Sequence, residues 1–246
     1  MGWSPPRWIA HRGGGSLAPE NTLAGIRLAA RLGFRAVEFD VMLSGDGTPL
    51  LIHDETLERT TNGCGRVSET QDAVLFALDA GGGEPLPTLH QACTLCARLG
   101  LWANVEIKPA AGQEERTAER VVRQLADCWR GPVPPLLSSF SPAALAVARD
   151  LAPALPRGLL YEVVPGDWLD DRQRLQAVSL HCAAEYLSDA VLVEAQARRI
   201  PLLCYTVNRP EQAASLLARG VSSLFTDQLD LFGAETAAYK ALHFGS

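Results

Sequence analysis

Short apolar runs alternate with longer amphipathic segments along almost the whole chain. The short runs have the length of strands, whereas the longer segments repeat their apolar residues at helical spacing. The expected strands are residues 7–11, 36–43, 101–108, 135–140, 157–161, 177–181, 201–207 and 221–226. The clearest helical patterns are residues 21–33, 89–100, 113–129, 141–152, 189–200 and 209–220. The chain therefore repeats a strand-then-helix unit.

About eight such units in 246 residues are typical of a closed (β/α)8 TIM barrel. We therefore predict one α/β barrel domain over residues 1–246. A doubly wound open sheet is the structural alternative. It ranks second, because the stretch "HRGGGSLAPE" after the first strand does not have the G-x-G-x-x-G spacing of a dinucleotide-binding turn.

The interval between the second and third expected strands is too long for one strand-then-helix unit. The chain between residues 43 and 101 exceeds what one helix and two loops require. It begins with "SGDGTPLLIHD", in which Asp46-Gly47 is a hairpin turn signal. We predict a small lid insertion over about residues 44–88, after the carboxyl end of the second strand. The active sites of barrels lie at the carboxyl ends of their strands.

Composition narrows the choice of partners. The net charge is −6 and the pI is about 5.4, which argues against nucleic-acid and membrane-surface binding, because both need an extended positive field. The first residues contain no apolar signal region, and no window approaches the length of a membrane span. Six scattered cysteines suggest reduced thiols. We expect a cytoplasmic protein with a small-molecule partner, and a homodimer is compatible with the sequence.

The stretch "AVEFDV" places two acids inside an apolar strand. Glu38 and Asp40 are two residues apart and share a face, which we expect to point into the barrel. In "NVEIK" the same periodicity puts Glu106 and Lys108 on one face of a neighbouring strand. Three close carboxylates repel one another unless a cation lies between them, and oxygen ligands favour Mg²⁺ or Ca²⁺. The alternative is that each acid pairs with an Arg or Lys, such as Lys108.

Two histidines accompany this cluster. His11 and Arg12 end the first strand, and His53 ends the strand of the predicted hairpin. Imidazoles beside acids and cations at strand ends suit acid–base chemistry on a phosphate bound to a metal. The remaining histidines lack such company, and we predict structural roles for them: His90, His181 and His243.

The motifs together resemble a known family. "AHRGGGSLAPENT", "VEFDV", "LLIHDETLERTTNGCGR", "PLPTL", "NVEIKP", "SSF" and "YTVN" are similar, in order and spacing, to glycerophosphodiester phosphodiesterases, most of all to their small cytoplasmic bacterial members. The resemblance implies a TIM barrel with a lid after the second strand. It also implies hydrolysis of diesters such as glycerophosphocholine and glycerophosphoethanolamine to sn-glycerol 3-phosphate and an alcohol, with Mg²⁺ or Ca²⁺ as cofactor.

The matching motifs also imply roles for individual residues. Glu38, Asp40 and Glu106 would hold the metal, His11 and His53 would be the acid–base pair, and Arg12 and Lys108 would bind the phosphate. Tyr205 stands where many members have Trp and would form an aromatic pocket wall. Asp227 lacks the proline that commonly follows it in the family, so no role is assigned to it. A barrel glycosidase and a catalytically silent binding barrel are the functional alternatives.

Overall fold

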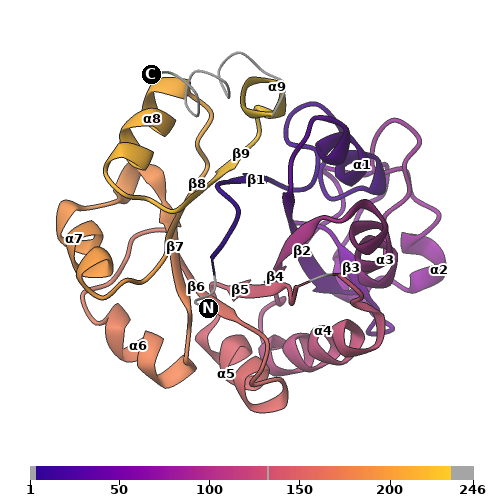
Figure 1. Cartoon of the computed structure of the whole chain (residues 1–246). Coiled ribbons are helices and arrows are strands. Elements are labelled where there is room, and N and C mark those ends of the chain that lie inside the picture. The colour runs from indigo at the N-terminus through magenta and orange to yellow at the C-terminus, as the bar shows by residue number, and fades with distance from the viewer. Residues whose placement is uncertain (1–3, 132, 234–246) are drawn as a thin grey trace.

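The computed structural model describes residues 4–131 and 133–233. Eight parallel strands form a closed barrel inside a ring of helices, and the first strand pairs with both the second and the last (Figure 1). The TIM barrel predicted from the sequence is confirmed. The barrel strands are β1 (Trp8–Ala10), β2 (Ala36–Leu43), β4 (Trp102–Ile107), β5 (Leu136–Ser139), β6 (Arg157–Tyr161), β7 (Ser179–Ala183), β8 (Leu202–Tyr205) and β9 (Ser223–Thr226).

Helices cover the outside of the barrel. Several begin at a residue whose hydroxyl caps the first turn, such as Thr22, Ser141 and Ser188, and Thr88 forms a full capping box with Gln91. The ring consists of α1 (Leu23–Arg31), α3 (Leu89–Leu99), α4 (Glu114–Cys128), α5 (Pro142–Leu151), α6 (Trp168–Leu175), α7 (Asp189–Ala197), α8 (Pro210–Ala218) and α9 (Leu229–Phe232). Among the residues that the structure describes, no helix is both long and apolar enough to cross a lipid bilayer.

Strand alternation separates two kinds of interior. In β2, Val37, Phe39 and Val41 belong to the large apolar core shared with the helices. A second cluster closes the inside of the barrel: Ile9, Ala36, Trp102, Leu136, Leu203 and Phe225. Glu38 and Asp40 lie on the inner face of the same strand. The apolar clusters therefore leave room for polar side chains in the barrel interior at the carboxyl ends of the strands.

The segment between β2 and α3 folds as an appendage beside the barrel mouth. Its strand β3 (Pro49–Leu51) pairs antiparallel with β2, so the predicted hairpin is confirmed. A single helical turn η1 (Val67–Glu69) and the short α2 (Asp72–Leu75) follow. A small apolar core, separate from the main one, holds this segment together and against the barrel, which contributes Met42 and Ala110: Met42, Leu50, Ile52, Leu57, Val67, Leu75, Ala80, Leu86 and Ala110. This packing fixes the end of β3, where His53 lies.

Candidate active site

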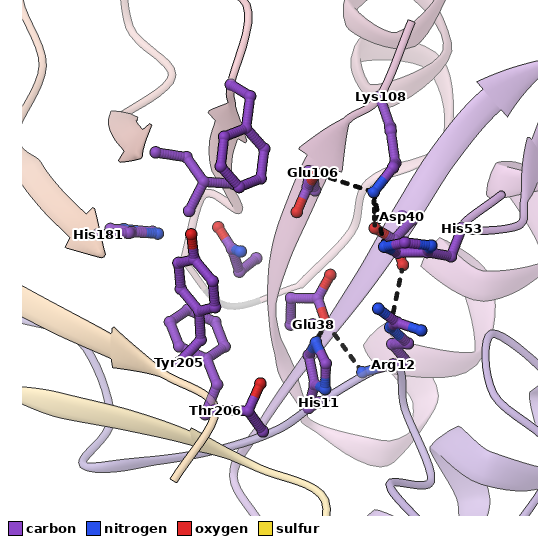
Figure 2. Close-up of a pocket in the computed structure, with 14 residues that line it drawn as sticks. His11, Arg12, Glu38, Asp40, His53, Glu106, Lys108, His181, Tyr205 and Thr206 are labelled. Atoms are coloured by element: carbon purple, nitrogen blue, oxygen red, sulfur yellow. Dashed lines mark hydrogen bonds and ion pairs between the residues drawn. The ribbon is translucent and has the colours of Figure 1, made fainter. Parts of the chain in front are cut away.

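A cavity of about 250 Å³ opens at the carboxyl ends of the barrel strands. All eight site residues predicted from the sequence line it: His11, Arg12, Glu38, Asp40, His53, Glu106, Lys108 and Tyr205. They come from five different strands or from the loops that follow them, and Figure 2 shows them around one space. The same wall also contains Asn104, Phe140, Leu160, His181, Thr206 and Phe225.

Three carboxylates converge on one side of this cavity. Asp40 of β2 pairs in register with Glu106 of β4, and Glu38 lies one inward position below Asp40. The side chains of Glu38, Asp40 and Glu106 each offer an oxygen, and these atoms all lie within 4.8 Å of one another. All three residues are buried. Adjacent parallel strands therefore build a group of oxygen ligands that could hold a divalent cation.

Burial without a cation is unfavourable for this group. Desolvation, followed by the charge of Asp40, raises the pKa of Glu106 to about 8. Desolvation, together with the charges of Asp40 and Glu106, also raises the pKa of Glu38 well above its ordinary value. One Oε1 atom of Glu38 and one of Glu106 are buried without a hydrogen-bond partner. The carboxylates therefore fit a cation, which would satisfy both oxygens and remove the repulsion.

Two cationic side chains border the cluster without neutralising it fully. The Nζ of Lys108 lies 3.7 Å from Oδ1 of Asp40 and 3.8 Å from Oε1 of Glu106, and the Nε of Arg12 lies 3.8 Å from Oδ2 of Asp40. These separations exceed a hydrogen bond. The backbone N–H of Arg12 donates to Glu38 at 2.8 Å. Simple ion pairing, the alternative considered from the sequence, therefore leaves the buried oxygens unsatisfied.

The two predicted catalytic histidines share one arrangement. Nδ1 of His11 lies 2.7 Å from a carboxylate oxygen of Asp227, and Nδ1 of His53 lies 2.5 Å from one of Asp54. On the other side of each ring, Nε2 of His11 lies 3.9 Å from Glu38, and Nε2 of His53 contacts the Nζ of Lys108 at 2.7 Å. Each imidazole thus has a carboxylate at Nδ1 and directs Nε2 toward the cavity, where Nε2 of His53 meets Lys108.

Burial lowers the pKa of His53, and the charge of Lys108 acts in the same direction against the opposing effects of Asp40 and Asp54. With Lys108 donating to Nε2, the neutral ring carries its proton on Nδ1, toward Asp54. The carboxylate therefore selects the tautomer and leaves Nε2 as the reactive nitrogen.

An aromatic wall faces the ionic side of the cavity. The rings of Tyr205 and Phe140 meet edge to face with their centroids 6.3 Å apart, and the hydroxyl of Tyr205 donates to the carbonyl oxygen of Tyr161 at 2.8 Å. Figure 2 shows Tyr205 and His181 across the cavity from Lys108 and His53. Tyr205 therefore forms part of the cavity wall.

The sequence missed several residues that support the site. Asp227 received no role, yet it contacts His11 and also accepts from Nδ2 of Asn208 at 3.0 Å. Asn21, which opens the helical pattern expected over residues 21–33, donates to Asp40 at 2.9 Å and accepts from the backbone N–H of Asp40, whereas Thr22 caps the helix. No local pattern marks Asp227, because 216 residues separate it from His11.

The histidines predicted to be structural have different positions. His181 is fully buried, but its ring lies in the cavity wall, where burial lowers its pKa to about 3. This residue therefore remains neutral. His90 is exposed on α3, and His243 lies outside the described residues.

The chain is similar to known proteins over most of its length. Residues 11–231 match the model of the glycerophosphoryl diester phosphodiesterase family. A glycerophosphodiester phosphodiesterase of Caldanaerobacter subterraneus is 31% identical over 226 residues, which cover 89% of this chain and 93% of the relative. One of Bacillus subtilis is 28% identical, with 91% and 84% covered. A phosphodiesterase structure from Oleispira antarctica, in complex with the product sn-glycerol-3-phosphate, has 37% identity and a TM-score of 0.88, covering 91% and 93%.

The fold and the cavity are thus those of a barrel hydrolase with an acidic cluster at its mouth. The chain belongs to the glycerophosphoryl diester phosphodiesterase family. Membership argues against the glycosidase alternative. The presence of every predicted site residue in one cavity argues against a catalytically silent barrel.

Proposed function

We propose that this protein hydrolyses glycerophosphodiesters, including glycerophosphocholine and glycerophosphoethanolamine, to sn-glycerol 3-phosphate and an alcohol with the help of Mg²⁺ or Ca²⁺. One observation carries the proposal: three buried carboxylates and two imidazoles, each backed by an aspartate, line a single cavity. Acid–base groups on both sides of an oxygen-rich cation site suit the cleavage of a phosphodiester.

Glu38, Asp40 and Glu106 would hold the cation, whose charge would polarise a phosphoryl oxygen and stabilise the charge that develops in the transition state. Arg12 and Lys108 border the same carboxylates and would bind the remaining phosphate oxygens. The ammonium of Lys108, which contacts His53 here, would turn to the phosphate and free Nε2 of that ring.

His11 would act as the general base. His53, once its Nε2 has taken up a proton to give the imidazolium, would act as the general acid that returns this proton to the leaving alcohol. Asp227 and Asp54 would hold the two rings through Nδ1. The base would activate either water or the 2-hydroxyl of the substrate glycerol, the second route giving a cyclic phosphate that water then opens. Both routes use the same nitrogen of His11.

The surrounding elements complete the proposal. The insertion of about residues 44–88 would act as a lid that carries His53, and residues 1–246 would form a single catalytic domain. Tyr205 would contact the substrate through its ring. All six cysteines are unpaired, which supports a cytoplasmic enzyme.

A coupled assay for glycerol 3-phosphate tests the proposed function. The protein is treated with EDTA and then supplied with Mg²⁺ or Ca²⁺, and choline, ethanolamine, glycerol and inositol diesters are compared. We expect no turnover after EDTA and recovery with at least one cation. Turnover that EDTA leaves unchanged would contradict the cation site, and the absence of glycerol 3-phosphate from every diester would contradict the activity.

A further inference from the structure

Arg59, in the insertion, connects two separate parts of the site. Its guanidinium donates four hydrogen bonds to two carboxylates. Nη1 and Nη2 contact the two oxygens of Glu20 at 2.8 and 2.9 Å, whereas Nε and Nη2 contact the two oxygens of Asp54 at 2.5 and 3.0 Å. Such bidentate pairing fixes the orientation of both carboxylates as well as their distance.

Each of these carboxylates also holds a group proposed to act on the substrate. Glu20 accepts from Nη1 of Arg12 at 2.9 Å, and Asp54 lies 2.5 Å from Nδ1 of His53. The chain of contacts therefore runs from Arg12 through Glu20, Arg59 and Asp54 to His53. It joins the loop after β1 to the insertion after β2.

The charges along this chain alternate and are partly shielded from solvent. Glu20 and Asp54 are 21% and 27% exposed, compared with 47% for Arg59. The hydrogen bond from Arg59 is the largest of the effects that hold the pKa of Asp54 far below its ordinary value. Asp54 therefore remains an anion behind His53.

An ordinary surface ion pair is available for comparison in the same insertion. Arg66 contacts Glu55 at 2.9 Å, with both side chains about half exposed, and neither residue lines the cavity. Exposed pairs of this kind contribute little to stability. Arg59 differs because its two partners each contact a residue of the cavity wall.

We propose that Arg59 is a positioning residue that acts through Asp54 on His53 and through Glu20 on Arg12. One side chain of the insertion thereby aligns the proton donor for the leaving alcohol and a ligand of the phosphate. This inference rests on the proposed function and adds a residue that itself touches neither the carboxylate cluster nor the cavity.

The leaving group provides the test, because an alcohol with a low pKa departs without help from a general acid. Turnover is measured with glycerophosphocholine and with the p-nitrophenyl ester of glycerol 3-phosphate. In Arg59→Ala, we expect kcat for the choline diester to fall by about 10²-fold, the scale of a misaligned catalytic group, and kcat for the nitrophenyl ester to fall less than about fivefold. KM should rise for both substrates, since Arg12 loses its support.

Further variants separate the effect of Arg59 on His53 from its effect on Arg12. Asp54→Asn should reproduce the dependence on the leaving group, and Glu20→Gln should chiefly raise KM. Arg59→Lys should be intermediate, because an ammonium cannot make the bidentate contacts. Added guanidinium ion should restore part of the activity of Arg59→Ala. Should that variant fail to fold by circular dichroism, the two carboxylate variants, which preserve side-chain size, decide the question.

Arg66→Ala is the matched control and should remain within about twofold of the wild type, as expected for an exposed ion pair. Equal losses on both substrates in the Arg59 and Asp54 variants, or Arg59→Ala kinetics that match those of Arg66→Ala, would overturn the role of Arg59 while the wild type still turns over. Absence of wild-type turnover would instead overturn the proposed function, and this inference with it.

Discussion

Two imidazoles line the cavity, that of His11 at the end of β1 and that of His53 in the segment after β3. If they are the acid–base pair, His11→Ala and His53→Ala should each lower turnover of glycerophosphocholine by at least about 10²-fold, the usual scale for a lost acid–base group. The coupled assay for glycerol 3-phosphate measures the change. His90→Ala on the exposed face of α3 is the control, and near-wild-type rates in both site variants would overturn the assignment.

Asp227 gives a second prediction at the scale of a residue. Its carboxylate lies 2.7 Å from Nδ1 of His11, whereas an amide at this position neither stabilises the charged ring nor favours one tautomer as strongly. Asp227→Asn should therefore lower kcat by about tenfold or more while the unfolding midpoint stays close to that of the wild type. Asp230→Asn, three residues further on in an exposed position, should leave the kinetics unchanged.

Equal kinetics for these two aspartate variants would show that Asp227 does not support His11. A loss of activity that accompanies a large drop in the unfolding midpoint would instead indicate a structural role for Asp227. The two measurements, kcat and the unfolding midpoint, therefore have to be reported together.

At the scale of elements, the insertion depends on a small apolar core that is separate from the main core of the barrel. Leu57 is 1% exposed and packs in the cluster that holds β3, η1 and α2 against the barrel. Leu57→Ala should lower the free energy of unfolding by about 2–5 kcal/mol, because a buried leucine leaves a cavity. The destabilised segment should open locally, so amide exchange should accelerate in residues 49–75 before it does so in the barrel strands.

The control for this experiment is Leu145→Ala in α5, a residue that is equally buried but belongs to the core between the barrel and its helices. It should destabilise the barrel without selective exchange in the insertion. If Leu57→Ala accelerates exchange evenly across the chain, the insertion does not open as a separate unit. The same variant should also lower turnover, because His53 follows β3.

At the scale of the whole molecule, the free energy of unfolding depends on the protonation of the acidic cluster, because the folded barrel buries these carboxylates. Because burial raises the pKa of Glu106 from 4.5 to about 8, the folded protein holds a proton on this residue that the unfolded chain releases. In protein stripped of divalent ions, the stability that this proton contributes is complete below about pH 4.5 and is lost as the pH rises through about 8.

Thermal unfolding of EDTA-treated protein checks this expectation. The pH is varied from about 5 to about 9, which covers most of the interval between the two pKa values. The midpoint should fall with increasing pH, and Mg²⁺ or Ca²⁺ should raise it most at the upper end, since a bound cation stabilises the folded state. Glu106→Gln cannot ionise and should flatten the profile. A profile that is the same in the variant and the wild type would contradict the raised pKa.

The sequence by itself determined the barrel and many of the residues that line its cavity. The alternation of strand and helix patterns is local, and the period of two along "AVEFDV" and "NVEIK" assigned Glu38, Asp40 and Glu106 to the inner face. His11, Arg12 and His53 were found because they end strands, and the ends of parallel strands meet at one side of a barrel. These features depend on neighbouring residues, so periodicity is enough to find them.

Only the tertiary structure decided which distant groups touch. Barrel closure pairs β1 with β9, which brings Asp227 to His11, and the packing of the insertion brings Arg59 to Glu20. The tertiary structure also places His181 in the cavity wall, although the sequence around His181 indicated a structural residue. Such contacts depend on the closure of long loops and on side-chain packing between elements, and neither leaves a repeating pattern along the chain.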